Sequence, residues 1–169
     1  MTEFFCQKCG AANPINAIYC KSCRHNLREA LHSDILTAFV AEPDNANFDD
    51  TLYKRKAYFP REAQLYLKVV DFDDEILCDL SKGWFTLGRK PQEEDSVHID
   101  FSRYDAADTG VSRLHARITR MHAVLLLEDL GTLNGTYVNR ERISAIDPCV
   151  LCNGDDIHLG NFRLKVEFR

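Results

Sequence analysis

Four of the seven cysteines lie near the start of the chain, in two Cys-x-x-Cys pairs. Cys6 and Cys9 form the first pair, and Cys20 and Cys23 form the second. A Cys-x-x-Cys turn directs two thiolates toward one ion, and two such turns supply the four sulfur ligands of tetrahedral zinc. Four thiolates also complete the coordination sphere and leave no position for an activated water. The sequence therefore predicts one structural Zn2+ rather than a catalytic metal.

The segment around these cysteines is too short to bury a hydrophobic core, so we expect the metal to supply most of its folding energy. Gly10 follows the first pair and Asn13-Pro14 breaks the chain between the pairs, which lets the backbone turn around an ion. Because four cysteines suffice, His25 and His32 are expected to be solvated or helical residues rather than ligands. The segment resembles the zinc ribbons found at the ends of many bacterial multidomain proteins.

This ribbon is the basic part of an acidic chain. The whole sequence has 21 Lys and Arg against 26 Asp and Glu, a net charge of −5. The ribbon and the residue that follows it instead carry Lys8, Lys21, Arg24 and Arg28 against Glu3 alone. Nucleic-acid binding through these cations is the alternative function that the sequence leaves open. Four cations contact few phosphates, however, so nucleic acid is not the expected partner.

The composition indicates a globular chain, with 169 residues of which 45% are apolar and 28% charged. That length is sufficient for one ordinary domain and a small extra module. No apolar run approaches the 18 or so residues of a membrane-spanning helix, so no membrane partner is expected. The first residues carry neither a basic stretch nor an apolar core typical of a secretory signal. We therefore expect a cytoplasmic protein whose cysteines are thiols or metal ligands.

Three segments follow from these patterns: a zinc ribbon over residues 1–27, a linker over 28–61 and a folded domain over 62–169. In the linker, apolar residues recur every four positions, which predicts a short amphipathic helix that ends near Val40. The apolar positions are Leu27, Leu31, Ile35 and Phe39.

The second half of the linker is acidic and aperiodic, which is typical of a flexible segment. Thr51 and Thr37 lie on this tether, where a kinase can reach an exposed threonine. The alternatives are an ordinary linker threonine or a phosphorylated one that folds back and blocks a binding site on the same chain.

From Gln64 onward the sequence consists of short alternating runs separated by Gly, Asn and Asp. Leu65, Leu67 and Val69 share one face of an expected strand, and the last eight residues alternate apolar and charged. Short strands at close spacing, without a helical pattern, predict an all-β sandwich with function on its connecting loops. The expected strands contain residues 65–69, 84–87, 97–99, 116–118, 124–127, 137–138, 157–159 and 162–169.

Three short motifs lie at the ends of the expected strands and in the loops between them. They are Gly88-Arg89, Ser112-Arg113-Leu114-His115 and Asn134-Gly135. In that order they resemble the hallmark of a forkhead-associated (FHA) domain, and the resemblance covers about residues 62–169. It implies a β-sandwich of about 11 strands that binds phosphothreonine peptides. The chain is then expected to be a non-enzymatic adaptor whose partner is a threonine-phosphorylated protein, downstream of a Ser/Thr kinase.

The resemblance gives four residues a part in peptide binding. Arg89 offers a planar fork of donors for two phosphate oxygens. Ser112 can donate its hydroxyl to the same phosphate, and Arg113 can add its backbone amide and its charge. Asn134 has both a donor and an acceptor, which suits the backbone of an extended peptide.

Three further residues are expected to support the site. Gly88 ends the strand that carries the arginine, His115 braces the loops through hydrogen bonds within the protein, and Gly135 permits the turn that projects the asparagine. One position departs from the family pattern, because Leu133 stands where a Thr or Ser often helps to bind phosphate. The loop over residues 102–111 is rather long, and we expect it to form one wall of the peptide groove.

Three cysteines lie outside the ribbon. Cys149 and Cys152 have the spacing of a redox pair, which is a third functional alternative. Neither follows a helix start that would lower its pKa, and free cysteines are commonly buried. We expect both, and Cys78 likewise, to pack in the domain core.

Overall fold

The computed structural model describes residues 3–6, 8–14, 17–27, 57–89 and 97–169. The predicted linker helix and the two linker threonines, Thr37 and Thr51, lie outside the described residues, so they stay predictions. His32 and Arg28 lie outside them as well.

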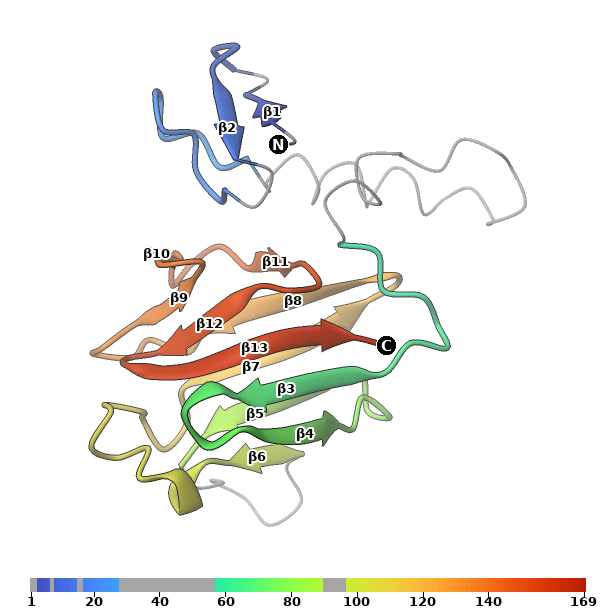
Figure 1. The fold of residues 1–169 in the computed structure, drawn as a ribbon, viewed down its shortest axis with the longest axis vertical. Helices are drawn as coiled ribbons and strands as arrows, with labels where there is room; N and C mark the ends of the chain where they lie inside the picture. Colours follow the sequence, from blue (N-terminus) through green and yellow to red (C-terminus); the bar gives the residue numbers. More distant parts are fainter. Residues whose placement is uncertain (1–2, 7, 15–16, 28–56, 90–96) are drawn as a thin grey trace.

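Two β-sheets pack face to face from Leu65 to the end of the chain (Figure 1). One sheet has six strands in the order β10-β9-β12-β13-β3-β4, and the other has five in the order β11-β8-β7-β5-β6. Every pair of neighbours is antiparallel except β5 and β6. The prediction of an all-β sandwich of about 11 strands is therefore confirmed. Within the described residues the only helices are two single turns, η1 (Val70–Phe72) and η2 (Ser102–Tyr104).

The strands of the six-stranded sheet are β3 (Leu65–Val69), β4 (Asp74–Cys78), β9 (Thr136–Val138), β10 (Glu141–Arg142), β12 (Asp156–Leu159) and β13 (Phe162–Phe168). Those of the five-stranded sheet are β5 (Trp84–Gly88), β6 (His98–Asp100), β7 (Ala116–Met121), β8 (Val124–Asp129) and β11 (Cys149–Leu151). The list of expected strands did not contain β4, β10 or β11. Strand β4 is an edge strand that begins with two acidic residues, β10 has only two residues and β11 only three.

Alternation explains which residues face the core. Leu65, Leu67 and Val69 are fully buried on the inner face of β3, whereas the side chains between them face outward. Strand β8 is a continuous apolar run because both of its faces are covered. Leu125 and Leu127 enter the main core, and Val124 and Leu126 pack in a second cluster on the outer side of the sheet.

The chain joins the sandwich a few residues earlier than the predicted start at residue 62. Ala57 packs in the cluster outside β8. Phe59 is fully buried, its N–H donates to the Ala123 carbonyl at 2.7 Å, and its ring meets Phe168 edge-on. Residues 57–60 therefore already pack as part of the folded domain.

The N-terminal segment lies against one side of the sandwich, above β10 and β11 in Figure 1. It contains a small hairpin of β1 (Glu3–Phe5) and β2 (Ala12–Pro14). Ile18 is 1% exposed and belongs to the main core of the sandwich. The Tyr19 N–H donates to Glu141 Oε2 at 3.1 Å. The two parts of the chain are thus joined by an apolar anchor and a hydrogen bond.

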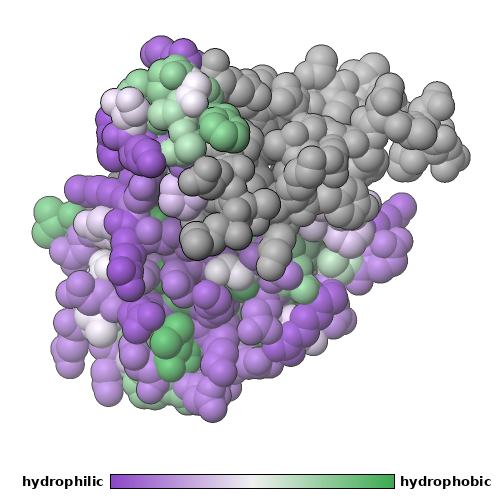
Figure 2. Space-filling model, turned by 45° about the horizontal axis from the view of Figure 1, so that its top comes forward, coloured by the Kyte–Doolittle hydropathy of each residue, from purple (hydrophilic) through white to green (hydrophobic). Residues whose placement is uncertain are grey.

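The face drawn in Figure 2 is mostly hydrophilic, with scattered hydrophobic residues. No helix in the described part of the chain has the length and apolar character needed to cross a membrane.

Candidate functional site

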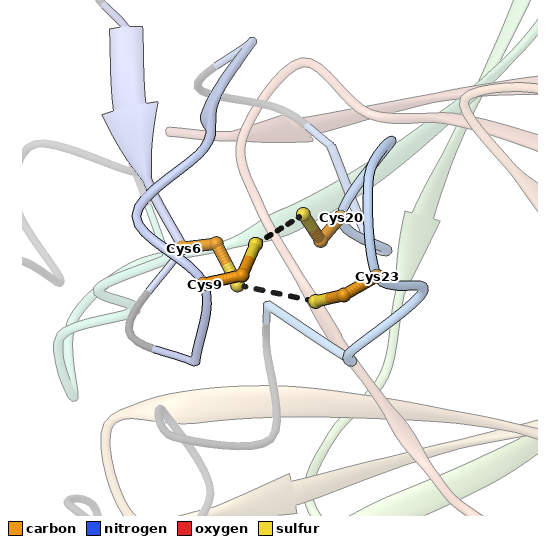
Figure 3. A group of neighbouring side chains, drawn as sticks. All are labelled: Cys6, Cys9, Cys20 and Cys23. Carbon is orange, nitrogen blue, oxygen red and sulfur yellow. Dashed lines mark hydrogen bonds between the residues drawn. The ribbon is translucent and has the colours of Figure 1, made fainter.

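The four N-terminal cysteines converge on one point (Figure 3). Their sulfur atoms all lie within 4.8 Å of one another, and we call these residues the cysteine cluster. Cys6 Sγ lies 3.7 Å from Cys23 Sγ, and Cys9 Sγ lies 3.6 Å from Cys20 Sγ. Thiolates about 2.3 Å from a tetrahedral ion lie roughly 3.8 Å apart, so this spacing fits zinc.

The two Cys-x-x-Cys turns have the same backbone geometry. In the first turn the Gly10 N–H donates to the Cys6 carbonyl at 2.8 Å, and in the second the Arg24 N–H donates to the Cys20 carbonyl at 2.9 Å. Gly10 and Arg24 both have positive φ, 72° and 58°. A repeated turn that aims two sulfur atoms at one point is what a closed four-thiolate site requires.

Asn13 holds the two turns together, which the sequence did not predict. It is 2% exposed; its side chain donates to the Ala11 carbonyl at 2.7 Å and accepts the Lys21 N–H at 2.9 Å. Asn13 and Pro14 are the last residues of β2, so the expected chain break there was wrong. The buried amide needs partners, and the backbone of the opposite turn provides one.

The thiols of the cluster titrate differently. Hydrogen bonds from the backbone of Cys23 and Ser22 lower the pKa of the Cys20 thiol to about 6. For Cys9, a hydrogen bond from the Ala11 backbone lowers the pKa, but the neighbouring thiols and burial outweigh it and raise the pKa to about 11.

Two nearby basic side chains, those of Arg24 and His25, supply no ligand atom to the cysteine cluster. His25 is absent from the group of converging ligand atoms, as the sequence predicts. The Arg24 guanidinium lies over the Tyr19 ring, 5.3 Å from its centre. Nucleic-acid binding through the ribbon stays the untested alternative.

A second candidate site forms where loops of both sheets meet, at the left of Figure 1. Its first part joins the end of β5 to the loop before β7. The Arg89 N–H is 3.1 Å from the carbonyl oxygens of both Ser112 and Arg113. A Cβ added at Gly88 would lie 2.1 Å from the Arg113 carbonyl oxygen, so only glycine allows this approach. Arg89 Nε also donates to the Val111 carbonyl at 2.5 Å.

His115 links this loop to the next one. It is completely buried, and its Nδ1 accepts the Ser112 N–H at 2.9 Å. Its Nε2 lies 3.2 Å from the Gly135 carbonyl and is therefore the protonated nitrogen of a neutral ring. Burial lowers the pKa of His115, although the Gly135 carbonyl and the Asp129 charge act in the opposite direction.

Asp129 organises the loop before Asn134, and the sequence did not point to it. Its carboxylate accepts the Gly131 and Thr132 N–H groups, each at 2.9 Å, and the Thr136 hydroxyl at 2.6 Å. Burial alone would raise the pKa of Asp129, but these hydrogen bonds outweigh it and lower the pKa. The sequence feature that could have pointed to Asp129 is its position as a carboxylate just before a Gly-Thr turn.

Asn134 is exposed at the tip of that loop and packs on two glycines. Its Nδ2 donates to the Gly110 carbonyl at 2.8 Å. A Cβ at Gly110 would lie 2.5 Å from Asn134 Nδ2, and a Cβ at Gly160 would lie 2.8 Å from the Thr109 carbonyl oxygen. Gly135 has a φ of +75°, which permits the turn. The contacts of Gly110 and Gly160 were not predicted from the sequence.

We call Arg89, Ser112, Arg113 and Asn134 the loop site. Ser112 is partly buried and Arg113 is exposed. In the described residues, no hydrogen bond engages the Ser112 hydroxyl, which leaves this donor available at the surface. Leu133, next to Asn134, is 91% exposed. The sequence-predicted residues thus come together, although their roles follow only from their chemistry.

The loop over residues 102–111 is tied down along its length. Tyr104 is buried and donates its hydroxyl to Asp74 Oδ2 at 2.6 Å, and Arg103 pairs with the same carboxylate at 2.8 Å. Val111 is in the main core, and the Asn161 N–H donates to the Thr109 carbonyl at 2.8 Å. This loop therefore offers a fixed wall beside Ser112 and Asn134.

The remaining cysteines are buried in the sandwich. Cys149 lies in the main core, whereas Cys152 lies in the cluster outside β8, so the two belong to different layers. Burial raises the pKa of Cys78 to about 12. These positions agree with the expectation that all three pack as small apolar residues.

The region that carries the loop site is similar to known proteins. The FHA domain model matches residues 85–160. The glycogen accumulation regulator GarA of Mycolicibacterium smegmatis is 47% identical over 57 residues, which are 34% of this chain and 34% of GarA. The oxoglutarate dehydrogenase inhibitor of Corynebacterium diphtheriae is 40% identical over 79 residues, 47% of each chain. The matches thus span a third to a half of these relatives' own length.

The fold is also similar to solved FHA structures. The FHA domain of an Arabidopsis thaliana hypothetical protein aligns with a TM-score of 0.50 and 24% identity, over 65% of this chain and 86% of that one. This similarity extends to the two-sheet architecture as a whole.

Proposed function

We propose that the chain is a non-enzymatic adaptor that binds a threonine-phosphorylated segment of a partner protein, because the FHA domain model matches residues 85–160 and the loop site lies within them. The observation that carries this proposal is the convergence of Arg89 and Ser112. The Arg89 backbone is bonded to the carbonyls of Ser112 and Arg113, and His115 fixes the same loop from behind. A phosphate that reaches one of these side chains is therefore within reach of the others.

The phosphate contacts follow from the donor groups. Arg89 would hold two phosphate oxygens with its guanidinium, Ser112 would donate its hydroxyl, and Arg113 would add its backbone N–H and its charge. Leu133 offers no polar side chain at the position where the family often has one, so binding depends more on Arg89 and Ser112.

Asn134 would hold the backbone of the peptide. One of its N–H groups is already used by the Gly110 carbonyl, and this bond fixes the orientation of the amide. Its Oδ1 has no hydrogen bond to any described residue and can accept a backbone N–H of an extended peptide.

The two relatives are named as a regulator of glycogen accumulation and as an inhibitor of oxoglutarate dehydrogenase. We infer a regulatory role for this chain as well, with a partner that a Ser/Thr kinase has phosphorylated.

We also propose that the cysteine cluster holds one structural zinc ion. Its support is the spacing of the sulfur atoms, 3.6 and 3.7 Å for the two closest pairs, and the matching geometry of the two turns. The ion would cross-link the two turns and leave no open coordination position, so it would act in folding and not in chemistry.

The test of peptide binding uses the full chain and a degenerate phosphothreonine peptide library, followed by titration of a selected peptide. Ser112→Ala is the informative variant, because its hydroxyl bonds to no described residue and its loss leaves the loop intact. We expect affinity to fall about tenfold or more, as is typical for a hydrogen bond to a charged group. Arg89→Ala should lower affinity at least as much.

The unphosphorylated form of the same peptide and the Arg61→Ala variant are the controls. Arg61 is an exposed cation shortly before β3, and β3 begins beside the end of β13, at the end of the strands away from the β12–β13 turn that adjoins the loop site. Equal affinity for phosphorylated and unphosphorylated peptides would overturn the proposal, as would a Ser112→Ala variant that binds like the wild type.

A further inference from the structure

Four side chains line up across the outer face of the six-stranded sheet. The strand register pairs Arg142 of β10 with Tyr137 of β9, Tyr137 with His158 of β12, and His158 with Arg163 of β13. Because neighbouring strands are about 4.8 Å apart, the row spans about 14 Å. We call these four residues the basic row. Both arginines are exposed, and the two residues between them are partly buried.

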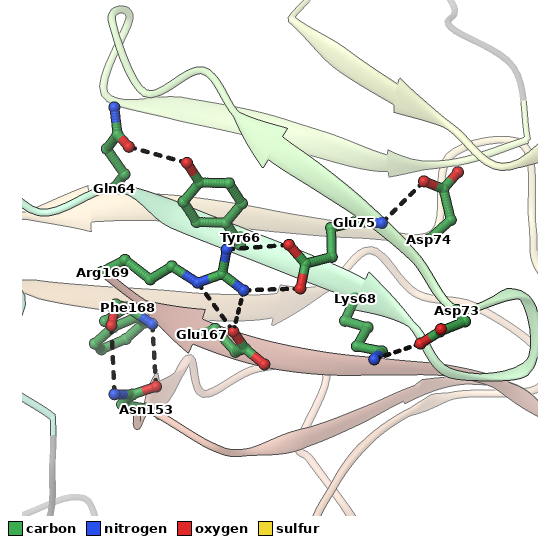
Figure 4. A network of polar contacts seen from close by, with 10 residues as sticks. All are labelled: Gln64, Tyr66, Lys68, Asp73, Asp74, Glu75, Asn153, Glu167, Phe168 and Arg169. Atoms are coloured by element: carbon green, nitrogen blue, oxygen red, sulfur yellow. Dashed lines mark hydrogen bonds and ion pairs between the residues drawn. The ribbon is translucent and has the colours of Figure 1, made fainter.

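The basic row differs from the rest of the same face, where charges are paired (Figure 4). Two pair positions along the strands, on the same face, Lys165 contacts Asp156 at 3.4 Å. Further along, Arg169 bridges Glu75 and Glu167, with a nitrogen 2.7 Å from Glu75 Oε1. In the described part of the chain, neither arginine of the basic row forms an ion pair, and Arg140 in the adjoining turn forms none either.

The titration of His158 agrees with an excess of positive charge. Burial lowers the pKa of this imidazole, and the charges of Arg163 and Arg140 lower it further. The carboxylates of Asp156 and Asp71 oppose this effect but do not reverse it. The row therefore has a positive potential that nearby acids do not cancel.

The basic row adjoins the loop site. The Arg142 guanidinium lies directly on Gly135, since a Cβ there would be 2.5 Å from Arg142 Nε. The Gly160 N–H donates to the Gly135 carbonyl at 3.0 Å, and a Cβ at Gly160 would lie 3.3 Å from that of Asn134. A peptide whose backbone is held at Asn134 can therefore continue onto the row without leaving the surface.

We propose that the basic row is a second contact surface for the phosphorylated partner and that it takes an acidic segment flanking the phosphothreonine. This proposal rests on the proposed phosphothreonine binding. Charge complementarity selects the occupant, because two exposed arginines on strands about 14 Å apart match about four residues of extended chain. Tyr137 and His158 between them offer flat surface against which such a segment can lie.

The experiment compares three phosphothreonine peptides with the same core and acidic, neutral or basic four-residue extensions, tested on both sides of the core. The wild-type chain should bind one acidic peptide roughly fivefold more tightly than the neutral one at low salt, as expected for several exposed charge pairs. Arg163→Glu should remove this preference and favour the basic peptide instead. A gain of that kind cannot come from misfolding.

Arg61→Glu is the matched control, because it changes the total charge equally at the opposite end of the sandwich. It should leave the acidic preference intact. Equal binding of the acidic and neutral peptides, or equal effects of Arg163→Glu and Arg61→Glu, would overturn the proposal. Competition gives a further test, in which a single-stranded oligonucleotide or a free acidic peptide displaces the phosphothreonine peptide that carries the acidic extension. If the oligonucleotide is the stronger competitor, the proposal is overturned, because the basic row then favours nucleic acid.

Binding of the neutral peptide distinguishes a failure of the basic-row proposal from a failure of the proposed phosphothreonine binding at the loop site. If the neutral peptide binds in a phosphate-dependent way and is unaffected by Arg163→Glu, the loop site functions irrespective of the basic row. If no peptide binds, the proposed function fails first.

Discussion

In the cysteine cluster the reactive atoms come from two turns of one short segment, whereas the residues of the loop site come from the ends of several strands of the sandwich. The first set converges through a repeated local turn, with Gly10 and Arg24 in equivalent positions. The second converges only because β5, β7 and β9 are held in register by the sheets.

The two sites also differ in what stabilises them. The N-terminal segment buries little beyond the cysteines and Leu27 in its own cluster, so the proposed zinc ion would provide most of its cohesion. The loop site instead lies on a buried polar network, in which His115 and Asp129 satisfy the backbone of two loops. Removal of the proposed ion would therefore disrupt the cysteine cluster, whereas removal of one supporting side chain, such as His115, would disrupt the loop site.

Metal removal should produce the largest effect. A strong chelator should release one zinc ion per chain and unfold the N-terminal segment, since structural zinc contributes on the order of 10 kcal/mol to such modules. Zinc release is followed with a colorimetric dye, and tetrahedral thiolate binding is checked by Co2+ absorption. Cys9→Ser should behave like the chelated chain and show no further response to chelator. Retention of a folded segment without metal would contradict the zinc proposal.

The contrast explains what the sequence could predict. Cysteine spacing is a local pattern, so all four members of the cluster were identified before the structure. Alternation likewise predicted β3 and β13, because one face of each is buried. Strand β4 was not predicted, since Asp74 and Glu75 interrupt its apolar pattern. Asp74 instead anchors a loop through Tyr104, and Glu75 forms an ion pair with Arg169.

The loop site was predictable only in part. Gly88, His115 and Asn134 belong to recognisable phrases, but their supports do not. Asp129 bonds to nearby residues of its own loop but stands outside the recognisable motifs. Gly160 acts through contacts with residues distant in sequence, and no local spacing encodes such contacts. The docking of Ile18 into the sandwich core is likewise a contact between residues distant in sequence, so no local pattern predicts it.

Ile18→Ala tests whether the two regions are independent. Ile18 is buried in the core of the sandwich, so its truncation should lower the free energy of unfolding by about 2–4 kcal/mol. The single tryptophan, Trp84, begins β5 and reports on the sandwich by fluorescence. Ile18→Val should cost about 1 kcal/mol on the same scale. An unchanged Trp84 transition in Ile18→Ala would mean that the ribbon and sandwich are uncoupled.

His115 gives the brace of the loop site a pH signature. Its pKa in the folded state is below the ordinary value of 6.5, so the unfolded chain binds a proton more readily. The stabilisation from neutral His115 is complete above pH 6.5 and is lost as the pH falls through the folded pKa. For one proton the slope is at most about 1.4 kcal/mol per pH unit.

Urea unfolding of the wild type and His115→Gln between about pH 7.5 and 5 measures this slope. His98 and His158 also have lowered pKa values and contribute in the same direction, so the substitution should reduce the slope rather than abolish it. Identical slopes for the two proteins would refute a neutral, buried His115.

The hydrogen bond between the Tyr19 N–H and Glu141 should have the smallest effect. Glu141→Ala removes the acceptor and should lower stability by about 1 kcal/mol, whereas Glu141→Gln keeps an oxygen at that position and should lower it less. If Ile18 is the main anchor, the Glu141→Ala effect measured by Trp84 should vanish once Ile18→Ala has already undocked the ribbon. A double-mutant cycle measures this coupling. Fully additive effects would show that the two contacts act independently, and the ribbon would then be attached to the sandwich by separate weak links instead of one cooperative interface.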